Sequence, residues 1–408
     1  LALIIRATRR PEVTVAMDRR GFQRTLLLTA LTAPLTGALW GCRWDRPTTP
    51  GSAAPCHRTI TEYELPPAEQ THEIIKMPGR PLVLVSQMSN STLVKLWLEQ
   101  GTEQVTGVRA FPLGPPSAML HGLAVSSRYP EKIWATHEAG NRLLLVDPGT
   151  DRLETPPKIV RTIDIPGGGK GPHYVGEYGD LLWVSLKSSN QVLAINHENP
   201  LRYWLYQAKP QPIFVARHPD TGEFYVSQDQ SNEILRINAD TKTTSRIEIP
   251  TARGTTPVGL VAGPAGLWVA LLGTKEQGTG TFGRINNNGE ITWFTLSSPE
   301  GRHAGLLHVA FDPPGAGQRP SAWLLASSII SPNSLDAIIR VTFDDTYTQL
   351  RSEEIAALPT QLCKAHRLLP LSNSVLATEL TSATVAQLVA QRDCRWDRPT
   401  TPESGDPN

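Results

Sequence analysis

Short apolar strands separated by tight polar turns repeat along the chain from residue 59 to about residue 390. In each repeat a first short strand is followed by an apolar strand that ends in a small polar residue, as at residues 182–185 (LWVS). A turn of Ser, Gly or Asn leads into a third strand, and a fourth strand ends the unit, most clearly at residues 290–296. Such turn residues tolerate the backbone angles of a hairpin. The pattern therefore predicts repeated units of four antiparallel strands.

Each unit opens on an equivalent position at which histidine is frequent. We place this position at His72, His121, His173, Ile213, Val258, His308 and His366, which are about 40 to 58 residues apart. Seven four-stranded units at this spacing predict an all-β, seven-bladed β-propeller around a central channel. If the position opens the innermost strand of each blade, all seven side chains lie near one channel mouth. In blade six, His303 is a rival for the position.

The ends of the repeat region predict how the ring closes. The last unit lacks a convincing fourth strand after Ala390, whereas residues 59–66 have fourth-strand character and precede the first unit. We expect residues 59–65 to pair antiparallel with residues 384–389, which hides sheet edges. The propeller then spans residues 59–390. An N-terminal extension with an export signal (1–41), a linker (42–58) and a disordered tail (391–408) make up the remainder.

Composition limits the function classes. The formal net charge is +1 and the sequence contains no long basic run, so the electrostatic footprint of a nucleic-acid-binding protein is absent. Frequent Gly and Pro and modest aromatic content suit a turn-rich all-β chain. We expect a monomer that binds no nucleic acid.

The N-terminal segment resembles an export signal. Residues 18–24 (DRRGFQR) resemble a twin-arginine motif after Met17, and the apolar run 25–40 follows. Residues 39–42 (LWGC) are similar to a lipobox, which predicts a lipid anchor at Cys42 and a location outside the cytoplasm. The alternative is an uncleaved membrane anchor, but a run of about 16 residues broken by Pro34 is short for a spanning helix.

The cysteines suggest a covalent closure of the ring. Cys56 and Cys394 lie just beyond the two strands that we expect to pair, so we predict a disulfide between them in an oxidising compartment. The segment 42–50 (CRWDRPTTP) recurs unchanged at 394–402. Both copies lie outside the blades, and we assign them no activity.

Several blade segments resemble a known family. Residues 60–66 (ITEYELP), 256–264 (TPVGLVAGP) and 282–292 (FGRINNNGEIT) look like the blade consensus of the streptogramin B lyases. Members of this family are seven-bladed propellers, and the characterised ones linearise a cyclic depsipeptide antibiotic by magnesium-dependent elimination at an ester. The resemblance therefore implies a carbon–oxygen lyase that acts on a cyclic ester.

The resemblance also implies roles for particular residues. It makes His366 the general base, His308 a substrate contact and Glu379 a magnesium ligand. Lys364 stands where the family has its second metal-binding carboxylate, and a cation cannot replace a carboxylate around Mg²⁺. Weak or absent magnesium binding follows, with Lys364 contacting substrate and supplying the positive charge itself.

The residues alone leave two classes of function open. A neutral imidazole can remove a proton α to a carbonyl, and several imidazoles together can hold a transition metal. His72, His121 and His173 would contact a small amphipathic or cyclic peptide ligand at the channel mouth, and Glu73, His137 and Gln228 would add polar groups there. One class is a lyase with His366 as base, and the other is an exported binding propeller without chemistry. Histidines that merely hydrogen-bond to neighbouring strands are the structural alternative.

Overall fold

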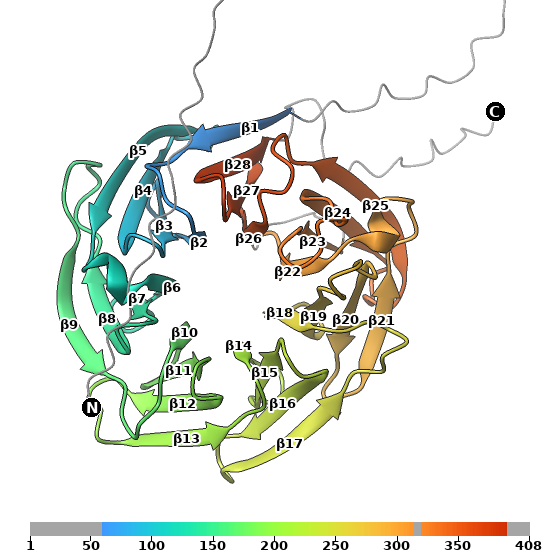
Figure 1. Cartoon of the computed structure of the whole chain (residues 1–408), viewed down its shortest axis with the longest axis horizontal. Coiled ribbons are helices and arrows are strands. Elements are labelled where there is room, and N and C mark those ends of the chain that lie inside the picture. The colour runs from blue at the N-terminus through green and yellow to red at the C-terminus, as the bar shows by residue number, and fades with distance from the viewer. Residues whose placement is uncertain (1–58, 314–319, 390–408) are drawn as a thin grey trace, which may run out of the picture. The chain divides into compact units, whose positions relative to one another are not determined.

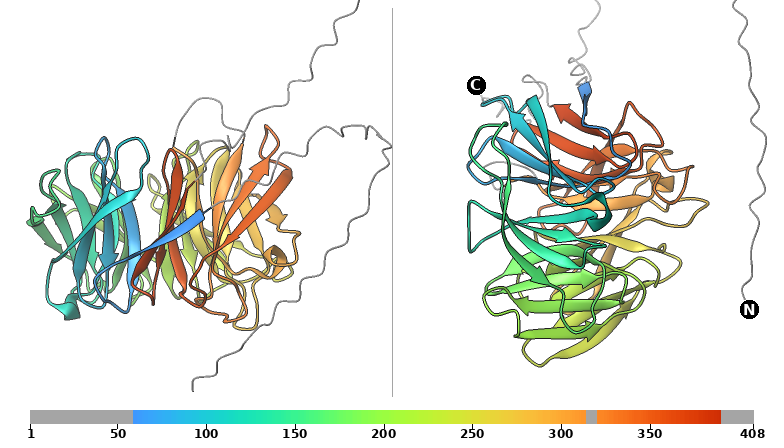
Figure 2. Two further views of the ribbon diagram at one scale, coloured as in Figure 1. Left: turned by 90° about the horizontal axis from the view of Figure 1, so that it is seen from above. Right: turned by 60° about the vertical axis from the view of Figure 1, so that its left-hand side comes forward.

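The computed structural model of the chain describes residues 59–313 and 320–389. Its strands form seven sheets of four, arranged around a central axis as the blades of a β-propeller (Figure 1). In the views of Figure 2 the strands run between the two faces of the ring. The predicted all-β, seven-bladed propeller is confirmed. No helix among the described residues is long and apolar enough to cross a membrane.

Within a blade, the four strands lie side by side, with the first at the channel and the last at the outside of the ring. The innermost strands of neighbouring blades contact one another. Blades one to four are β2 (Thr71–Lys76), β3 (Leu82–Gln87), β4 (Thr92–Leu98), β5 (Val105–Pro112); β6 (Leu120–Val125), β7 (Ile133–His137), β8 (Arg142–Asp147), β9 (Lys158–Asp164); β10 (Pro172–Tyr178), β11 (Leu181–Leu186), β12 (Gln191–Asn196), β13 (Tyr203–Gln207); β14 (Pro212–Arg217), β15 (Phe224–Gln228), β16 (Glu233–Asn238), β17 (Thr243–Glu248). Blades five to seven are β18 (Pro257–Gly263), β19 (Gly266–Leu271), β20 (Thr281–Ile285), β21 (Ile291–Thr295); β22 (Leu306–Ala310), β23 (Ser321–Ala326), β24 (Ala337–Phe343), β25 (Leu350–Ala357); β26 (Ala365–Pro370), β27 (Ser374–Glu379), β28 (Thr384–Val389), β1 (Thr59–Glu64). Two short 3-10 helices, η1 (Pro116–Ala118) and η2 (Gly301–His303), lie in connections.

The seventh blade is closed by the N-terminal strand of the described chain. β1 pairs antiparallel with β28 in a register that sets Thr59 opposite Val389. Glu62 of β1 also accepts hydrogen bonds from the N–H and the hydroxyl of Thr360, at 2.7 and 2.8 Å. The predicted pairing of the two chain ends is therefore confirmed.

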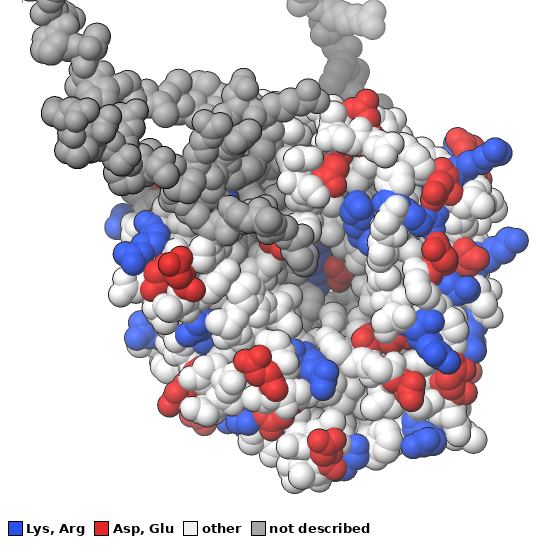
Figure 3. All heavy atoms as spheres, turned by 180° about the vertical axis from the view of Figure 1, so that it is seen from behind, with Lys and Arg blue, Asp and Glu red and all other residues white. Residues whose placement is uncertain are grey.

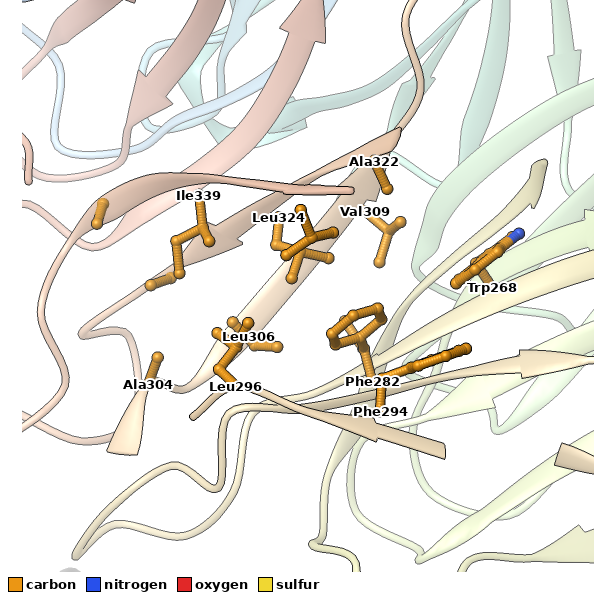
Figure 4. Close-up of a cluster of buried hydrophobic side chains, with 14 of the residues drawn as sticks. Trp268, Phe282, Phe294, Leu296, Ala304, Leu306, Val309, Ala322, Leu324 and Ile339 are labelled. Carbon is orange, nitrogen blue, oxygen red and sulfur yellow. The ribbon is translucent and has the colours of Figure 1, made fainter. Parts of the chain in front are cut away.

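The hydrophobic core is divided into seven clusters that lie between neighbouring blades. Side chains alternate between the two faces of a strand, so the second strand of a blade contributes residues to the clusters on both of its sides. In β19, Trp268 packs toward Val309 and Leu324 of blade six (Figure 4). Its neighbours Leu267 and Val269 belong to the cluster on the opposite side. This alternation explains the repeated apolar second strands in the sequence.

Hydroxyl groups at the ends of the second strands fix the innermost strands to one another. Every innermost strand has a register irregularity directly after its first residue. In blade three the Ser185 hydroxyl accepts a hydrogen bond from the N–H of Tyr174 at 3.1 Å and donates to the carbonyl of Ile213 in blade four at 2.7 Å. The same pair of hydrogen bonds, one accepted and one donated, is made by the hydroxyls of Ser86, Thr136, Ser227 and Thr378. The small polar residue of the repeat is therefore an inter-blade contact.

We expect Ser185→Ala to lower the free energy of unfolding by about 1–3 kcal/mol, because it leaves a half-buried N–H and a buried carbonyl without their partner. Urea denaturation at constant m-value measures the loss. The matched control is Ser245→Ala, which removes an exposed hydroxyl from the outer strand β17 and is expected to change stability by less than about 0.5 kcal/mol. Equal effects of the two substitutions would contradict the role of the inter-blade hydroxyl.

Some sequence predictions concern residues outside the described ranges. These are the export signal, the lipid anchor at Cys42, the disulfide between Cys56 and Cys394, and the duplicated segment. They stay predictions. Among the described residues, Cys363 is buried and forms no disulfide.

Candidate functional site

The second residues of the innermost strands form one layer around the channel. Four of them are neighbouring imidazoles, His366, His72, His121 and His173, whose successive ring centroids are 4.2, 4.2 and 3.9 Å apart. Each of these side chains is at most 8% exposed. The remaining second residues, Ile213, Val258 and Leu307, are apolar and buried. We call the four-imidazole part of the channel, contributed by blades seven, one, two and three, the histidine end.

His308 does not belong to this layer, so its predicted alignment was wrong by one residue. β22 begins at Leu306, and its register irregularity lies at Leu307, which therefore occupies the second position. Two adjacent leucines precede His308, so the hydrophobic pattern did not determine where the strand begins. The rival His303 is exposed in η2.

One residue further along the strands, the side chain of Arg367 reaches across the channel and also pairs with a carboxylate of the neighbouring blade. Arg367 of blade seven has its guanidinium carbon 4.1 Å from the ring centre of Phe214 in blade four, and its Nε lies 3.2 Å from Glu73 Oε2 in blade one. It also donates a hydrogen bond to the carbonyl of His366, at 3.0 Å. Burial lowers the pKa of Arg367, which the Glu73 carboxylate opposes. The channel next to the imidazole layer therefore contains a paired, buried charge.

The five predicted site histidines are held uncharged. Burial lowers the pKa of His72, His121, His173, His308 and His366 well below the ordinary value of 6.5, and the positive charge of Arg367 lowers each pKa further. A neutral imidazole has one N–H donor and one nitrogen lone pair. Each of these rings, the four in the layer and His308 beside it, thus offers one nitrogen lone pair, whose direction depends on the hydrogen bonds of the ring.

His121 has its tautomer fixed by the backbone. Its Nδ1 lies 2.8 Å from the carbonyl oxygen of His173, and this oxygen can only accept, so Nδ1 carries the proton. The lone pair is therefore on Nε2, which is buried without a hydrogen-bond partner. Glu138 Oε2 lies 3.9 Å from this nitrogen and 2.8 Å from His173 Nδ1. The three side chains form a compact group of nitrogen and oxygen ligand atoms.

Glu138 was not predicted as a site residue. It follows directly after β7, at the turn that the sequence shows as His137-Glu138-Ala139-Gly140-Asn141. The second strands end beside the first residues of the innermost strands, as His137 lies opposite Leu120. A search of the residue after each second strand for charged side chains would have found Glu138.

Glu379 and Lys364 fit a magnesium site poorly, although Glu379 Oε1 is buried without a hydrogen-bond partner. Glu379 Oε2 accepts hydrogen bonds from Ser382 at 2.7 Å and from Thr384. Burial, with a smaller contribution from the nearby Glu62, raises the pKa of Glu379 to about 7, although the hydrogen bonds from Thr384 and Ser382 lower it. Mg²⁺ takes oxygen ligands in near-octahedral geometry, and here one carboxylate oxygen is committed to hydroxyls while the second position is a lysine. The residues present do not fit the ion, and no step below uses it.

The other polar residues expected at the channel mouth have different surroundings. Gln228 accepts a hydrogen bond from the N–H of Lys209 at 2.6 Å and donates to the carbonyl of Glu233 at 3.3 Å, so it stabilises its own loops. His137 is buried at the end of β7, and its Nε2 has no partner among the described residues.

Solved structures with this fold include lyases. The structure of a catalytically inactive virginiamycin B lyase from Staphylococcus aureus with quinupristin has a TM-score of 0.61 at 17% identity, over 82% of this chain and 99% of that chain. A streptogramin B lyase structure has a TM-score of 0.61 at 19% identity, over 82% and 98%. The chain shares its fold with the streptogramin B lyases. At such identities the likeness concerns the fold.

The same fold also occurs in a protein solved with a peptide. The structure of YCF48 bound to D1 peptide has a TM-score of 0.56 at 14% identity, over 84% of this chain and 100% of that chain. No protein-family model and no curated protein matches the chain. Because one fold hosts different functions, the function has to be argued from the side chains.

Proposed function

We propose that this chain is a ligand-binding propeller that holds a small amphipathic or cyclic peptide ligand at the histidine end. The observation that carries the proposal is the set of uncommitted nitrogen atoms there. Buried nitrogens of His72, His121 and His366 have no hydrogen-bond partner, whereas buried polar atoms are normally paired. A ligand that donates hydrogen bonds or brings a cation would satisfy them.

The residues to which the resemblance gives roles in the lyase reaction make structural contacts here or differ in charge. His308 Nδ1 accepts a hydrogen bond from the N–H of Leu368 at 3.1 Å, which holds the ring against blade seven. Glu379 is held by hydroxyl groups within its own blade. The cation of Lys364 replaces the second carboxylate. These three residues favour binding over elimination.

Elimination at a cyclic ester is the second candidate, and one observation favours it. His366 is uncharged and its Nδ1 has no partner, so this nitrogen could accept an α-proton. However, burial and the adjacent Arg367 lower the pKa of His366, which weakens it as a base.

We expect the purified chain to bind a streptogramin B and to leave its ring closed, with and without magnesium. The linear product of elimination is an isomer of the ring, so chromatography rather than mass alone must detect it. Titration calorimetry measures binding, and His366→Ala, which removes one of the three unpaired nitrogens, is expected to weaken binding and to leave the ring closed. Ring opening that requires magnesium, is lost in His366→Ala and rises in Lys364→Glu would contradict the proposal and support the lyase.

We further infer that the mature chain acts outside the cytoplasm as a monomer and begins at or near Cys42. The twin-arginine-like motif, the apolar run and the lipobox-like residues 39–42 support this location. It stays a prediction, because these residues lie outside the described ranges.

A further inference from the structure

We propose that His121, Glu138 and His173 bind one divalent transition-metal ion, for which Zn²⁺ is the best-fitting candidate. The inference rests on the proposed function, because it names what the histidine end offers to a ligand. It concerns blades two and three, whereas the lyase-like positions lie in blades six and seven.

The distances suit a small ion. One ligand atom from each of the three residues lies within 4.8 Å of the others. Zinc bonds of about 2.0–2.2 Å in a tetrahedral arrangement set ligand atoms roughly 3.3–3.5 Å apart. The two separations from Glu138 Oε2, 3.9 Å to His121 and 2.8 Å to His173, lie on either side of this value. A sub-ångström movement of the Glu138 side chain is enough to equalise them.

The hydrogen bonds prepare the ligand atoms. The bond from His121 Nδ1 to the carbonyl of His173 directs the Nε2 lone pair of His121 toward the carboxylate of Glu138. Metal-bound histidines are commonly oriented in this way through their second nitrogen. Glu138 Oε2 accepts a hydrogen bond from His173 Nδ1 at 2.8 Å, so His173 has to move its proton to Nε2 before Nδ1 can bind an ion. His121 Nε2 has no such partner, because the 3.9 Å to Glu138 is too long for a hydrogen bond, and a cation between these two groups would satisfy both.

The ligand types decide between metals. Two imidazole nitrogens and one carboxylate oxygen suit zinc and other late first-row ions, whereas Mg²⁺ and Ca²⁺ prefer oxygen ligands. Three protein ligands leave the fourth tetrahedral position open. A carboxylate or carbonyl oxygen of the bound molecule would complete the shell, which makes anionic or peptide ligands the class that this site selects.

The test uses the full chain without a histidine tag, with its thiols alkylated and its metals removed by chelation. Titration calorimetry with Zn²⁺ is expected to give one ion per chain. Glu138→Gln keeps the size and removes the charge, and it is expected to weaken binding by about 100-fold or more, since loss of even an outer-shell partner costs 10–100-fold. His303→Ala removes an exposed histidine far from the group in sequence and is expected to leave the affinity unchanged.

A second readout covers the case in which Glu138→Gln does not fold. The visible absorption of the wild-type chain with Co²⁺ is expected to show a tetrahedral nitrogen–oxygen site. Absence of stoichiometric Zn²⁺ binding, or equal affinity in wild type and a folded Glu138→Gln, overturns the metal site and leaves the binding propeller standing. Ring opening of a streptogramin B overturns the proposed function whatever the metal content.

Discussion

Lowering the pH from 7.5 to 5.5 is expected to remove several kcal/mol of folding free energy from this chain. His72, His121, His173, His308 and His366 are buried with pKa values well below 6.5. Below about pH 6.5 these histidines bind protons in the unfolded chain but stay neutral in the folded chain. Each such histidine costs about 1.4 kcal/mol of stability per pH unit below this point. Stability is therefore highest above pH 6.5 and falls as the pH falls.

Urea denaturation at the two pH values, in the presence of a chelator, measures this loss. His72→Asn removes one titrating ring and is expected to reduce the pH dependence by one proton, whereas His303→Asn at an exposed position is expected to leave it unchanged. Glu379 changes stability in the opposite direction, because its pKa in the folded chain is raised to about 7. The protonated carboxyl therefore favours the folded state at low pH, and this stabilisation is lost as the pH rises from about 4.5 to 7. Equal stability at both pH values would contradict the account of a neutral imidazole layer.

Removal of β1 is expected to abolish the soluble monomer. A chain that begins at Leu65 lacks the strand that pairs with β28, whereas a chain that begins at Thr59 keeps it. The shorter chain leaves the edge of β28 open for pairing with other molecules and breaks the contacts of Glu62 with Thr360. Light scattering after size-exclusion chromatography is expected to show a monomer for the longer chain and aggregates for the shorter one. Monomers of equal thermal stability would contradict ring closure as the source of stability.

The fold could be predicted from local pattern because each blade repeats the same strand and turn chemistry. Strand pairing at the closure was also predictable, since the strand missing from the last unit is present before the first. The hydroxyl at Ser185 was visible as a repeated small polar residue, but its bond to Ile213 of the next blade depends on two strands distant in sequence.

The site was less predictable. His308 was misplaced by one position because two leucines before it fit either start of the strand. Arg367 was not considered, although its guanidinium reaches blade four, because no local pattern reveals a side chain that crosses a channel. Glu138 follows a strand rather than lying in one, and its meeting with His121 and His173 results from the packing of neighbouring blades.

Anomalous diffraction from crystals soaked with Zn²⁺ or with Mn²⁺ tests most directly which part of the channel is the functional site. The account predicts a zinc peak about 2.0–2.2 Å from His121 Nε2, Glu138 and His173 Nδ1, and no manganese peak at Glu379. A metal peak between Glu379 and His366, with none at Glu138, would contradict it and would place the functional site at the lyase-like positions.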